Sequence, residues 1–293
     1  MEIFIQLMVS GILIGVSYGV LAAGLSLIFG VMRIINFAHA SFAVLAMYFP
    51  AFWFLKWWGI DPFISAGIAL PMFFVIGYFM QRLLLERVMR GSGPQTSTLI
   101  MTMGFSLLIE NMILIVCSGA PRIINQPYTL ATWRVGNIFI NHAQTYSVFI
   151  SLILIVMLFL FLNRTMIGKG IRAAADDPEG CAYMGINLRF VHAIAFSMGI
   201  AITAAGGCLM ATYRPFNPFY GQTIIIILFS NVVLGGMGSI TGALIGGLII
   251  GVVQQLSTLV VSTSLQNVAV FALFVLFLYL RPQGLLGKKG RAV

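Results

Sequence analysis

Long apolar runs, separated by short polar connections, constrain the fold of this chain more than any motif does. Each run is about as long as a helix must be to cross the roughly 30 Å hydrocarbon layer of a membrane. Lipid offers no partners to free backbone groups, so only helices are economical for such runs. We therefore expect an all-α, polytopic membrane protein with eight or nine segments, at about 5–31, 34–55, 62–81, 96–118, 145–163, 191–211, 222–238, 240–261 and 265–281.

The seventh and eighth segments are the least regular of the predicted spans. Residues 222–238 and 240–261 are short or broken by glycine around Gly235-Gly236-Met237-Gly238. They form either two ordinary spans or one re-entrant hairpin. We expect no cleavable signal peptide, because the first apolar run has no basic region before it and is long enough to span.

The composition excludes a soluble domain and a nucleic-acid-binding protein. Only 8% of the residues are charged and 60% are hydrophobic, more apolar surface than a soluble fold could bury. The net charge of +9 has another explanation, because Lys and Arg collect in the cytoplasmic loops of membrane proteins. We therefore expect the lipid bilayer, and no nucleic acid, as a partner.

The basic residues predict the orientation of the chain. If all nine segments cross and the C-terminus is cytoplasmic, 12 of the 16 Lys and Arg residues fall inside, and the N-terminus lies outside. The four outside are Lys56, Arg122, Arg134 and Arg214. The polar segment around residues 168–187 then faces the cytoplasm.

That polar segment carries the helix signals expected of a small docking element. It holds three of the seven acidic residues of the chain. Asp177 is a suitable N-cap, and Pro178 suits the first helical position. Glu179 favours the positive end of a helix, and Gly185 can end it. We expect a helix of about two turns that presents a surface to a partner; the alternative is an ordinary solvated loop helix.

Few polar residues lie at membrane depth, where each is costly unless it is paired or wet. The candidates for a translocation path or gate are Asn36, His39, Glu110, Asn111 and Asn231. For Glu110 we favour a buried, hydrogen-bonded or protonated side chain over a substrate ligand. His39 is more often a packing residue than a gate.

Small residues predict close helix packing. Gly11, Gly15 and Gly19 recur every four residues on one helix face, where they let another backbone approach. Gly242 and Gly246 repeat this spacing late in the chain, as do Gly247 and Gly251. These faces pack within one subunit or contact a second one. The cysteines Cys117, Cys181 and Cys208 have no metal-ligand spacing and are interpreted as packing residues.

The chain contains no Gly-x-x-x-x-Gly-Lys-Ser/Thr phosphate-binding motif and no evident pairing of nucleophile and base. We therefore expect no enzyme activity and no ATP site in the chain itself.

Four sequence blocks occur in order along nearly the whole chain. They are RIINFAH at 33–39, AADDPE at 174–179 with MGIN at 184–187, VLGGMGS at 233–239 with Gly242-Ala243, and RPQGLLG at 281–287. Together they resemble the permeases of branched-chain amino acid ABC importers, and within that family the shorter of the two sibling permeases. The chain departs from the family at Ala40, where glycine is usual, and at Gly180, where alanine is common. Gly180 costs the short helix about 1 kcal/mol of propensity, so its partner would order it.

The resemblance implies a single transmembrane permease domain, 1–293, of an ATP-driven importer for branched-chain or related amino acids in the bacterial cytoplasmic (inner) membrane. Its partners would be a sibling permease, two cytoplasmic ATPase subunits that bind the ATP, and an extracytoplasmic solute-binding protein. That protein would dock on segments 119–144 and 212–221. A coupling loop at about 164–190 would contact an ATPase through Asp176, Asp177, Pro178, Glu179, Gly180, Tyr183, Met184, Gly185, Ile186 and Asn187.

Two other functions stay open. An ion-coupled secondary transporter of a small polar solute would need a coupling-ion site at a broken helix, for which Glu110 and the break at 235–238 are the hints. A channel or membrane-anchored scaffold has less in its favour.

Overall fold

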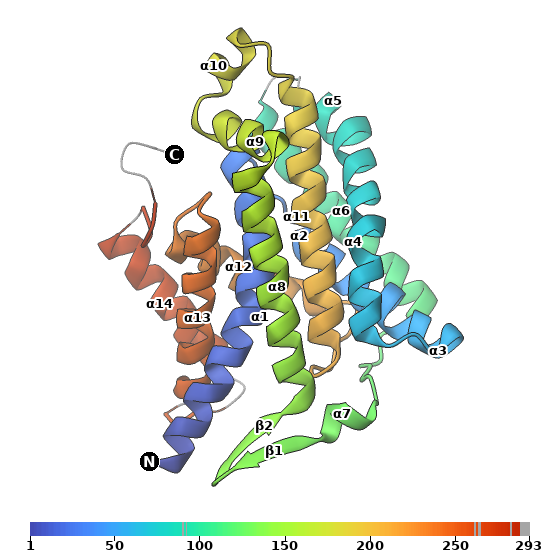
Figure 1. The fold of residues 1–293 in the computed structure, drawn as a ribbon, viewed down its shortest axis with the longest axis vertical. Coiled ribbons are helices and arrows are strands. Elements are labelled where there is room, and N and C mark those ends of the chain that lie inside the picture. The colour runs from blue at the N-terminus through green and yellow to red at the C-terminus, as the bar shows by residue number, and fades with distance from the viewer. Residues whose placement is uncertain (90, 92, 261, 263–264, 282, 288–293) are drawn as a thin grey trace.

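The computed structural model is a bundle of helices with a small β-hairpin at one end (Figure 1). It describes residues 1–293 except 90, 92, 261, 263–264, 282 and 288–293. The elements are α1 (Glu2–Met32), α2 (His39–Ala46), η1 (Met47–Trp53), α3 (Phe54–Trp58), α4 (Pro62–Met80), η2 (Gln81–Leu85), α5 (Glu86–Met89), α6 (Pro94–Cys117), α7 (Pro127–Leu130), β1 (Thr132–Val135), β2 (Ile138–Asn141), α8 (His142–Arg164), α9 (Met166–Asp176), α10 (Pro178–Tyr183), α11 (Leu188–Ala211), α12 (Tyr220–Gly235), α13 (Ile240–Ser257) and α14 (Gln266–Leu280).

The apolar runs of the sequence are helices. Within the described residues, seven helical stretches are long and apolar enough to cross a membrane, and α12 and α14 are shorter apolar helices. This confirms the polytopic helical fold class. The second predicted span begins later than expected, because Arg33 takes a left-handed φ of 53° and ends α1, and the next helix begins at His39.

The predicted break near residue 236 is a tight turn between two helices. Gly236 and Gly238 have φ values of 102° and 84°, which favour glycine. Beyond the turn, Gly242 packs against Gly235, and Gly246 packs against Asn231. Helices α12 and α13 are therefore antiparallel neighbours, and whether both cross the membrane stays a prediction.

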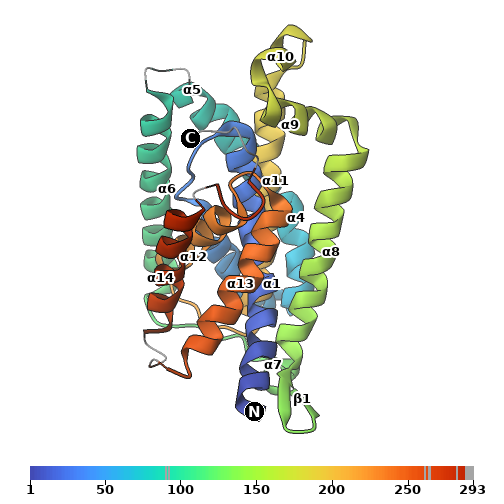
Figure 2. The same ribbon diagram turned by 90° about the vertical axis from the view of Figure 1, so that its left-hand side faces the viewer.

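Helices α1 and α11 form the centre of the bundle. They are the most buried of the seven long helical stretches, whereas α6 is the least buried and lies at one edge (Figure 2). The backbones approach closely, since a Cβ atom on Gly24 would lie 2.5 Å from the Gly199 carbonyl oxygen. Apolar side chains gain little by leaving lipid for protein, so such close packing supplies the attraction between membrane helices.

Two stretches depart from the regular α-helices that the sequence predicts. The second span widens into a π-helix at Met47–Trp53, and the third at Gln81–Leu85. The first of these contains Pro50, which has no backbone N–H to donate. Proline and π-segments are both recognised places where a helix departs from regular geometry, and here the two coincide.

The two ends of the bundle differ in character. The N-terminus and the β1–β2 hairpin lie at one end, the hairpin end, and α9 and α10 lie at the other, the α10 end (Figure 1). The hairpin turns at Gly136, whose φ is 63°. Tyr128 of α7 donates a 2.8 Å hydrogen bond to the Asp61 carboxylate. Burial and that hydrogen bond raise the pKa of Tyr128, so the donor persists at high pH.

Candidate functional site

The short helix α10 is built by its own sequence at both ends. The Asp177 carboxylate accepts a 3.0 Å hydrogen bond from the Gly180 N–H, and Pro178 fills the first helical position. At the other end the Ile186 N–H bonds the Cys181 carbonyl at 2.9 Å, and the Gly185 N–H bonds the Ala182 carbonyl at 3.1 Å. This pattern, with Gly185 at a φ of 76°, is a Schellman motif. The helix thus forms where the sequence predicts it.

Helix α10 presents two large side chains to the outside. Tyr183, its last residue, is 88% exposed, and Met184, which caps it, is 82% exposed. Helix α10 lies at the end of the molecule opposite the hairpin (Figure 1). Exposed aromatic and methionine side chains on a polar element are typical of a protein-binding surface. Glu179 of α10 is exposed as well, and so is Asp176 at the end of α9.

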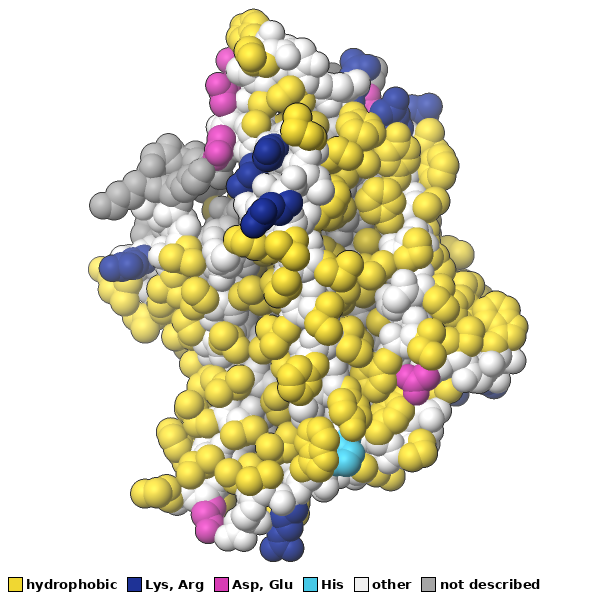
Figure 3. Space-filling model, viewed as in Figure 1, with side chains coloured by type: hydrophobic (Ala, Val, Ile, Leu, Met, Phe, Trp, Pro, Cys, Tyr) yellow, Lys and Arg dark blue, Asp and Glu magenta, His cyan; other side chains and the backbone are white. Residues whose placement is uncertain are grey.

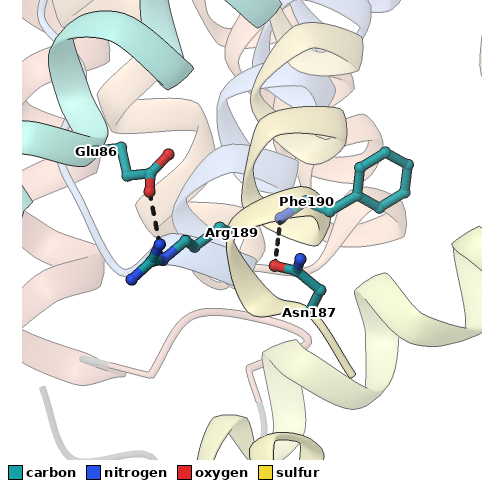
Figure 4. A network of polar contacts seen from close by, with 4 residues as sticks. All are labelled: Glu86, Asn187, Arg189 and Phe190. Carbon is teal, nitrogen blue, oxygen red and sulfur yellow. Dashed lines mark hydrogen bonds and ion pairs between the residues drawn. The ribbon is translucent and has the colours of Figure 1, made fainter. Parts of the chain in front are cut away.

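The element that carries α10 is braced against the bundle. The Asn187 side chain accepts a 3.2 Å hydrogen bond from the Phe190 N–H and so caps α11 (Figure 4). Two residues on, Arg189 forms a 3.3 Å ion pair with Glu86 (Figure 4). Cys181 is buried in the core. A displacement of α10 would therefore be transmitted to α11.

The structure explains why position 180 is glycine, which the sequence alone does not reveal. A Cβ atom at this position would meet the Asp177 carboxylate that caps the helix. Glycine therefore leaves room for the cap, which offsets part of its cost in helix propensity.

A second polar cluster surrounds Glu110 inside the apolar part of the bundle. Glu110 is only 2% exposed. Its Oε1 accepts hydrogen bonds from Ser106 at 3.2 Å and Ser41 at 3.4 Å, and its Oε2 accepts one from the Gln222 amide at 2.9 Å. The two serine hydroxyls lie 2.8 Å apart. Glu110 thus joins three elements, α2, α6 and α12.

The other candidate residues of the path lie apart from Glu110. Asn111 is exposed, and its amide bonds the Leu107 carbonyl of its own helix at 2.8 Å. His39 is fully buried, with Nε2 2.6 Å from the Thr203 hydroxyl and 3.1 Å from the Leu21 carbonyl. The described residues therefore do not gather these side chains around one cavity.

Two of the candidate path residues have buried amide atoms without a hydrogen-bond partner in the described part of the chain. Asn231 is fully buried, and neither its Nδ2 nor its Oδ1 has a hydrogen-bond partner there. Asn36 is also fully buried; its Oδ1 accepts from the Ala38 N–H at 3.1 Å, but its Nδ2 has no partner. Such groups are costly in a dry environment and call for an explanation.

Sequence reasoning missed the partners of Glu110. Ser106 and Glu110 are four residues apart on α6, so the spacing places them on one helix face, and that signal was available. Ser41 and Gln222 come from other elements, and only the fold brings them in. Among the described residues, no group of three or more His, Cys, Asp or Glu side chains is placed to hold a metal ion.

The glycines of α1 form a seam with α13. A Cβ atom on Gly11 would lie 2.7 Å from the Val252 Cα, and one on Gly15 would lie 2.7 Å from the Gly247 carbonyl oxygen. A Cβ atom on Gly19 would touch Leu244. Gly242 and Gly246 face α12 rather than α1. One face of α13 therefore packs on α1 and another on α12.

We expect Gly15→Val to destabilise the bundle strongly, because its side chain would force the α1 and α13 backbones apart. Overpacking of this kind costs about 1–3 kcal/mol or more. Gly104→Val is the matched control, since a Cβ atom on Gly104 of α6 would meet nothing within 4 Å. Thermal unfolding in detergent is followed by size-exclusion chromatography. The midpoint temperature of unfolding should fall for Gly15→Val and stay unchanged for Gly104→Val. Equal midpoints would contradict the seam.

Comparison with known proteins assigns the chain to a family. The family model described as branched-chain amino acid transport system, permease component, matches residues 7–280. No solved structure matches the chain.

Curated relatives agree over nearly the full length. The high-affinity branched-chain amino acid transport system permease protein LivH of Salmonella typhimurium is 30% identical over 297 residues, which cover 97% of this chain and 96% of LivH. The corresponding protein BraD of Pseudomonas aeruginosa is 29% identical over 299 residues, with the same coverage of 97% and 96%. A probable LivH of Methanocaldococcus jannaschii is 29% identical and covers 81% of this chain and 76% of its own length. The chain therefore belongs to the family of permease components of branched-chain amino acid transport systems and is a membrane subunit of an ABC importer.

Proposed function

We propose that this chain forms the path of an importer for branched-chain or related amino acids in the cytoplasmic membrane. It would share that path with a sibling permease. Two cytoplasmic ATPase subunits would supply the energy, and an extracytoplasmic protein would deliver the solute. The match of the family model to residues 7–280 supports this assignment.

Coupling to the ATPases is assigned to α10 and the segment around it, residues 164–190. The observation that carries this proposal is the exposure of Tyr183 and Met184 on a capped helix that is braced to α11. The chain has no phosphate-binding motif of its own, so the energy of ATP must arrive through a protein contact. The α10 end is assigned to the cytoplasm, because this orientation places most Lys and Arg residues inside.

The path is assigned to the side of the bundle where α6 meets α12, at the contact between Glu110 and Gln222. Gln222 is exposed there, and Asn111 is exposed on a different face of α6. Exposed amides at membrane depth require water or a polar partner, which a sibling permease would supply. We assign Asn36 and Asn231 to gating, since their unpartnered amides would gain partners in a second conformation. His39 would hold α2 on α11.

The solute-binding protein is assigned to the hairpin end. Residues 119–144 and 212–221 meet there, because the backbones of Arg122 and Phe216 exchange hydrogen bonds of 2.8 and 3.0 Å. This contact joins the two segments into one surface.

Reconstitution tests the importer against its main rival. The chain, its sibling permease and the ATPases are placed in liposomes, and uptake of radiolabelled leucine is measured with the binding protein present. We expect uptake that requires ATP. Uptake driven by an ion gradient without the ATPases would favour the secondary transporter, for which Glu110 is the candidate ion site.

Cysteine labelling tests the orientation. In a background without Cys117, Cys181 and Cys208, Met184→Cys and Val135→Cys place single thiols at opposite ends, on side chains that are 82% and 63% exposed. In intact cells, a membrane-impermeant maleimide should label position 135 and spare position 184 until the membrane is opened. Labelling of both positions in intact cells would overturn the coupling role of α10.

A further inference from the structure

A groove opens at the α10 end, where four elements meet. It has a volume of about 190 Å³ and lies between the ends of α1 and α8, helix α9 and the start of α13. Its apolar wall includes Leu27, Val31, Phe159 and Leu162. Three of its lining residues, Ile171, Arg172 and Ala175, belong to the segment 164–190, whereas the coupling contact rests on Tyr183 and Met184 at the α10 tip.

Arg172 is the one charged residue among the described residues that line the groove. Arg172 and Asn163 line it, and the Arg172 guanidinium donates a 2.6 Å hydrogen bond to the Asn163 side chain. Arg164 and Lys169 are exposed nearby in sequence, at the end of α8 and on α9. Figure 3 shows Lys and Arg side chains gathered where α9 crosses the bundle, with hydrophobic side chains next to them. Asp176, at the end of α9, is the one acidic residue of that helix.

Helix α9 has the build of an interfacial helix. It runs across the end of α8 instead of continuing it (Figure 2). Gly168, Ile171 and Ala174 face the bundle. Its outer side begins with two apolar residues, Met166 at 81% and Ile167 at 40% exposure, and continues with the basic ones. Apolar and basic side chains on one exposed face suit the boundary between acyl chains and headgroups.

The level of the boundary follows from α8. Phe159 and Leu160 are each 49% exposed near its end, as side chains in contact with lipid are, and the first basic residue, Arg164, comes one turn later. The groove therefore opens where headgroups lie, and its apolar wall continues toward the acyl chains. Basic pockets between membrane helices are suited to anionic lipid headgroups.

We propose that this groove is a binding site for an anionic phospholipid. The Arg172 guanidinium, supported by Arg164 and Lys169, binds the headgroup phosphate, and one acyl chain lies in the groove beside Phe159 and Leu162. A guanidinium fork suits phosphate geometry, and the surrounding positive charge complements the lipid. A bound lipid would fasten α9, and with it the base of α10, to the membrane. The site depends on the fold and the bilayer, and not on which solute is transported.

Lipid retention tests the site in the full-length chain purified with its partner subunits. The protein is incorporated into nanodiscs that contain equal amounts of phosphatidylglycerol and phosphatidylcholine, re-extracted, and examined by native mass spectrometry. Bound phosphatidylglycerol should exceed phosphatidylcholine. Arg172→Gln should lower its retention about fivefold. Arg87→Gln removes an exposed arginine of α5 that does not line the groove and should change nothing.

Two further arms separate a lipid from a free phosphate or a protein partner. Thr241→Trp places a large ring on the groove wall and should reduce retention of the lipid as Arg172→Gln does. Glycerol 1-phosphate at millimolar concentration should fail to displace the lipid, because it lacks the acyl chains. Displacement by glycerol 1-phosphate, together with normal retention by Thr241→Trp, would overturn the acyl-chain assignment. Equal retention by Arg172→Gln and Arg87→Gln would overturn the site and leave a protein partner to cover the groove.

Discussion

Replacing Tyr183 and Met184 together by aspartate is expected to abolish ATP-driven uptake while the chain still inserts and assembles with its sibling. Both side chains are more than four-fifths exposed, so the folded bundle loses almost no packing. A buried anchor in a protein interface contributes about 2 kcal/mol or more, and aspartate would bring an unpaired charge into that contact. Loss of two anchors predicts a fall of more than about tenfold in coupled transport. The measurements are leucine uptake and co-purification of the ATPase subunits at matched expression.

Conservative replacement provides the control for this variant. Tyr183→Phe with Met184→Leu keeps the size and apolar character of both side chains and should retain most uptake. Ala182→Pro is a second disruption, because proline in α10 removes a helical hydrogen bond and clashes with the preceding turn at a cost of about 3 kcal/mol. Normal uptake by a well-expressed double aspartate variant would show that the ATPase is contacted elsewhere.

The sequence predicts most of the architecture because the membrane removes alternatives. An apolar run of sufficient length has to be a helix, so the spans could be placed within a few residues. The ends of α10 were equally accessible, since Asp177, Pro178 and Gly185 act through their own backbone neighbours. Features that depend on local chemistry were therefore predictable.

The missed features depend on chain segments meeting. The sequence pattern predicts a loop where α9 lies, although Thr165 caps this helix through a 3.0 Å hydrogen bond from the Gly168 N–H. The sequence pattern predicts no helix or strand in segment 119–144, yet the segment contains α7 and the hairpin. Its strands are four residues long and carry a weak pattern, and Gln6 of α1 holds β2 through the Phe139 backbone at 2.8 Å in both directions. A strand this short cannot be predicted from its own residues, because its pairing partners come from elsewhere in the chain.

For the polar candidates of the path, burial could be predicted from the sequence, but the contacts between side chains could not. Membrane depth alone singled out Glu110, Asn36, His39 and Asn231, and all four are buried. Depth could not predict which of them meet, because α2 turns His39 toward Thr203 and Ser41 toward Glu110 from the same first turn. Asn111 follows Glu110 directly in sequence but points away from it, as neighbours on a helix do.

Glu110→Leu is expected to lower uptake more than about fivefold, whereas Glu110→Gln should retain most of it. The glutamine oxygen can still accept from Ser106 and Ser41, and rotation of the Gln222 amide would present its oxygen to the new NH₂ group. Leucine offers no acceptor. The two serines can bond each other across 2.8 Å, so the unmet group is the Gln222 amide at membrane depth. An unsatisfied donor costs about 1–3 kcal/mol, enough to weaken the junction of α6 and α12.

The pair of variants also decides between a structural and an ionic role for Glu110. Leucine uptake and co-purification of the sibling permease are measured for both at equal expression. If the carboxylate serves as an acceptor, assembly and uptake fall together in Glu110→Leu, and both survive in Glu110→Gln. A coupling-ion site depends on the charge, which glutamine removes while the hydrogen bonds remain. Loss of uptake in an assembled Glu110→Gln complex would therefore contradict the acceptor role and favour ion-coupled transport, because hydrogen bonding alone cannot distinguish the two side chains.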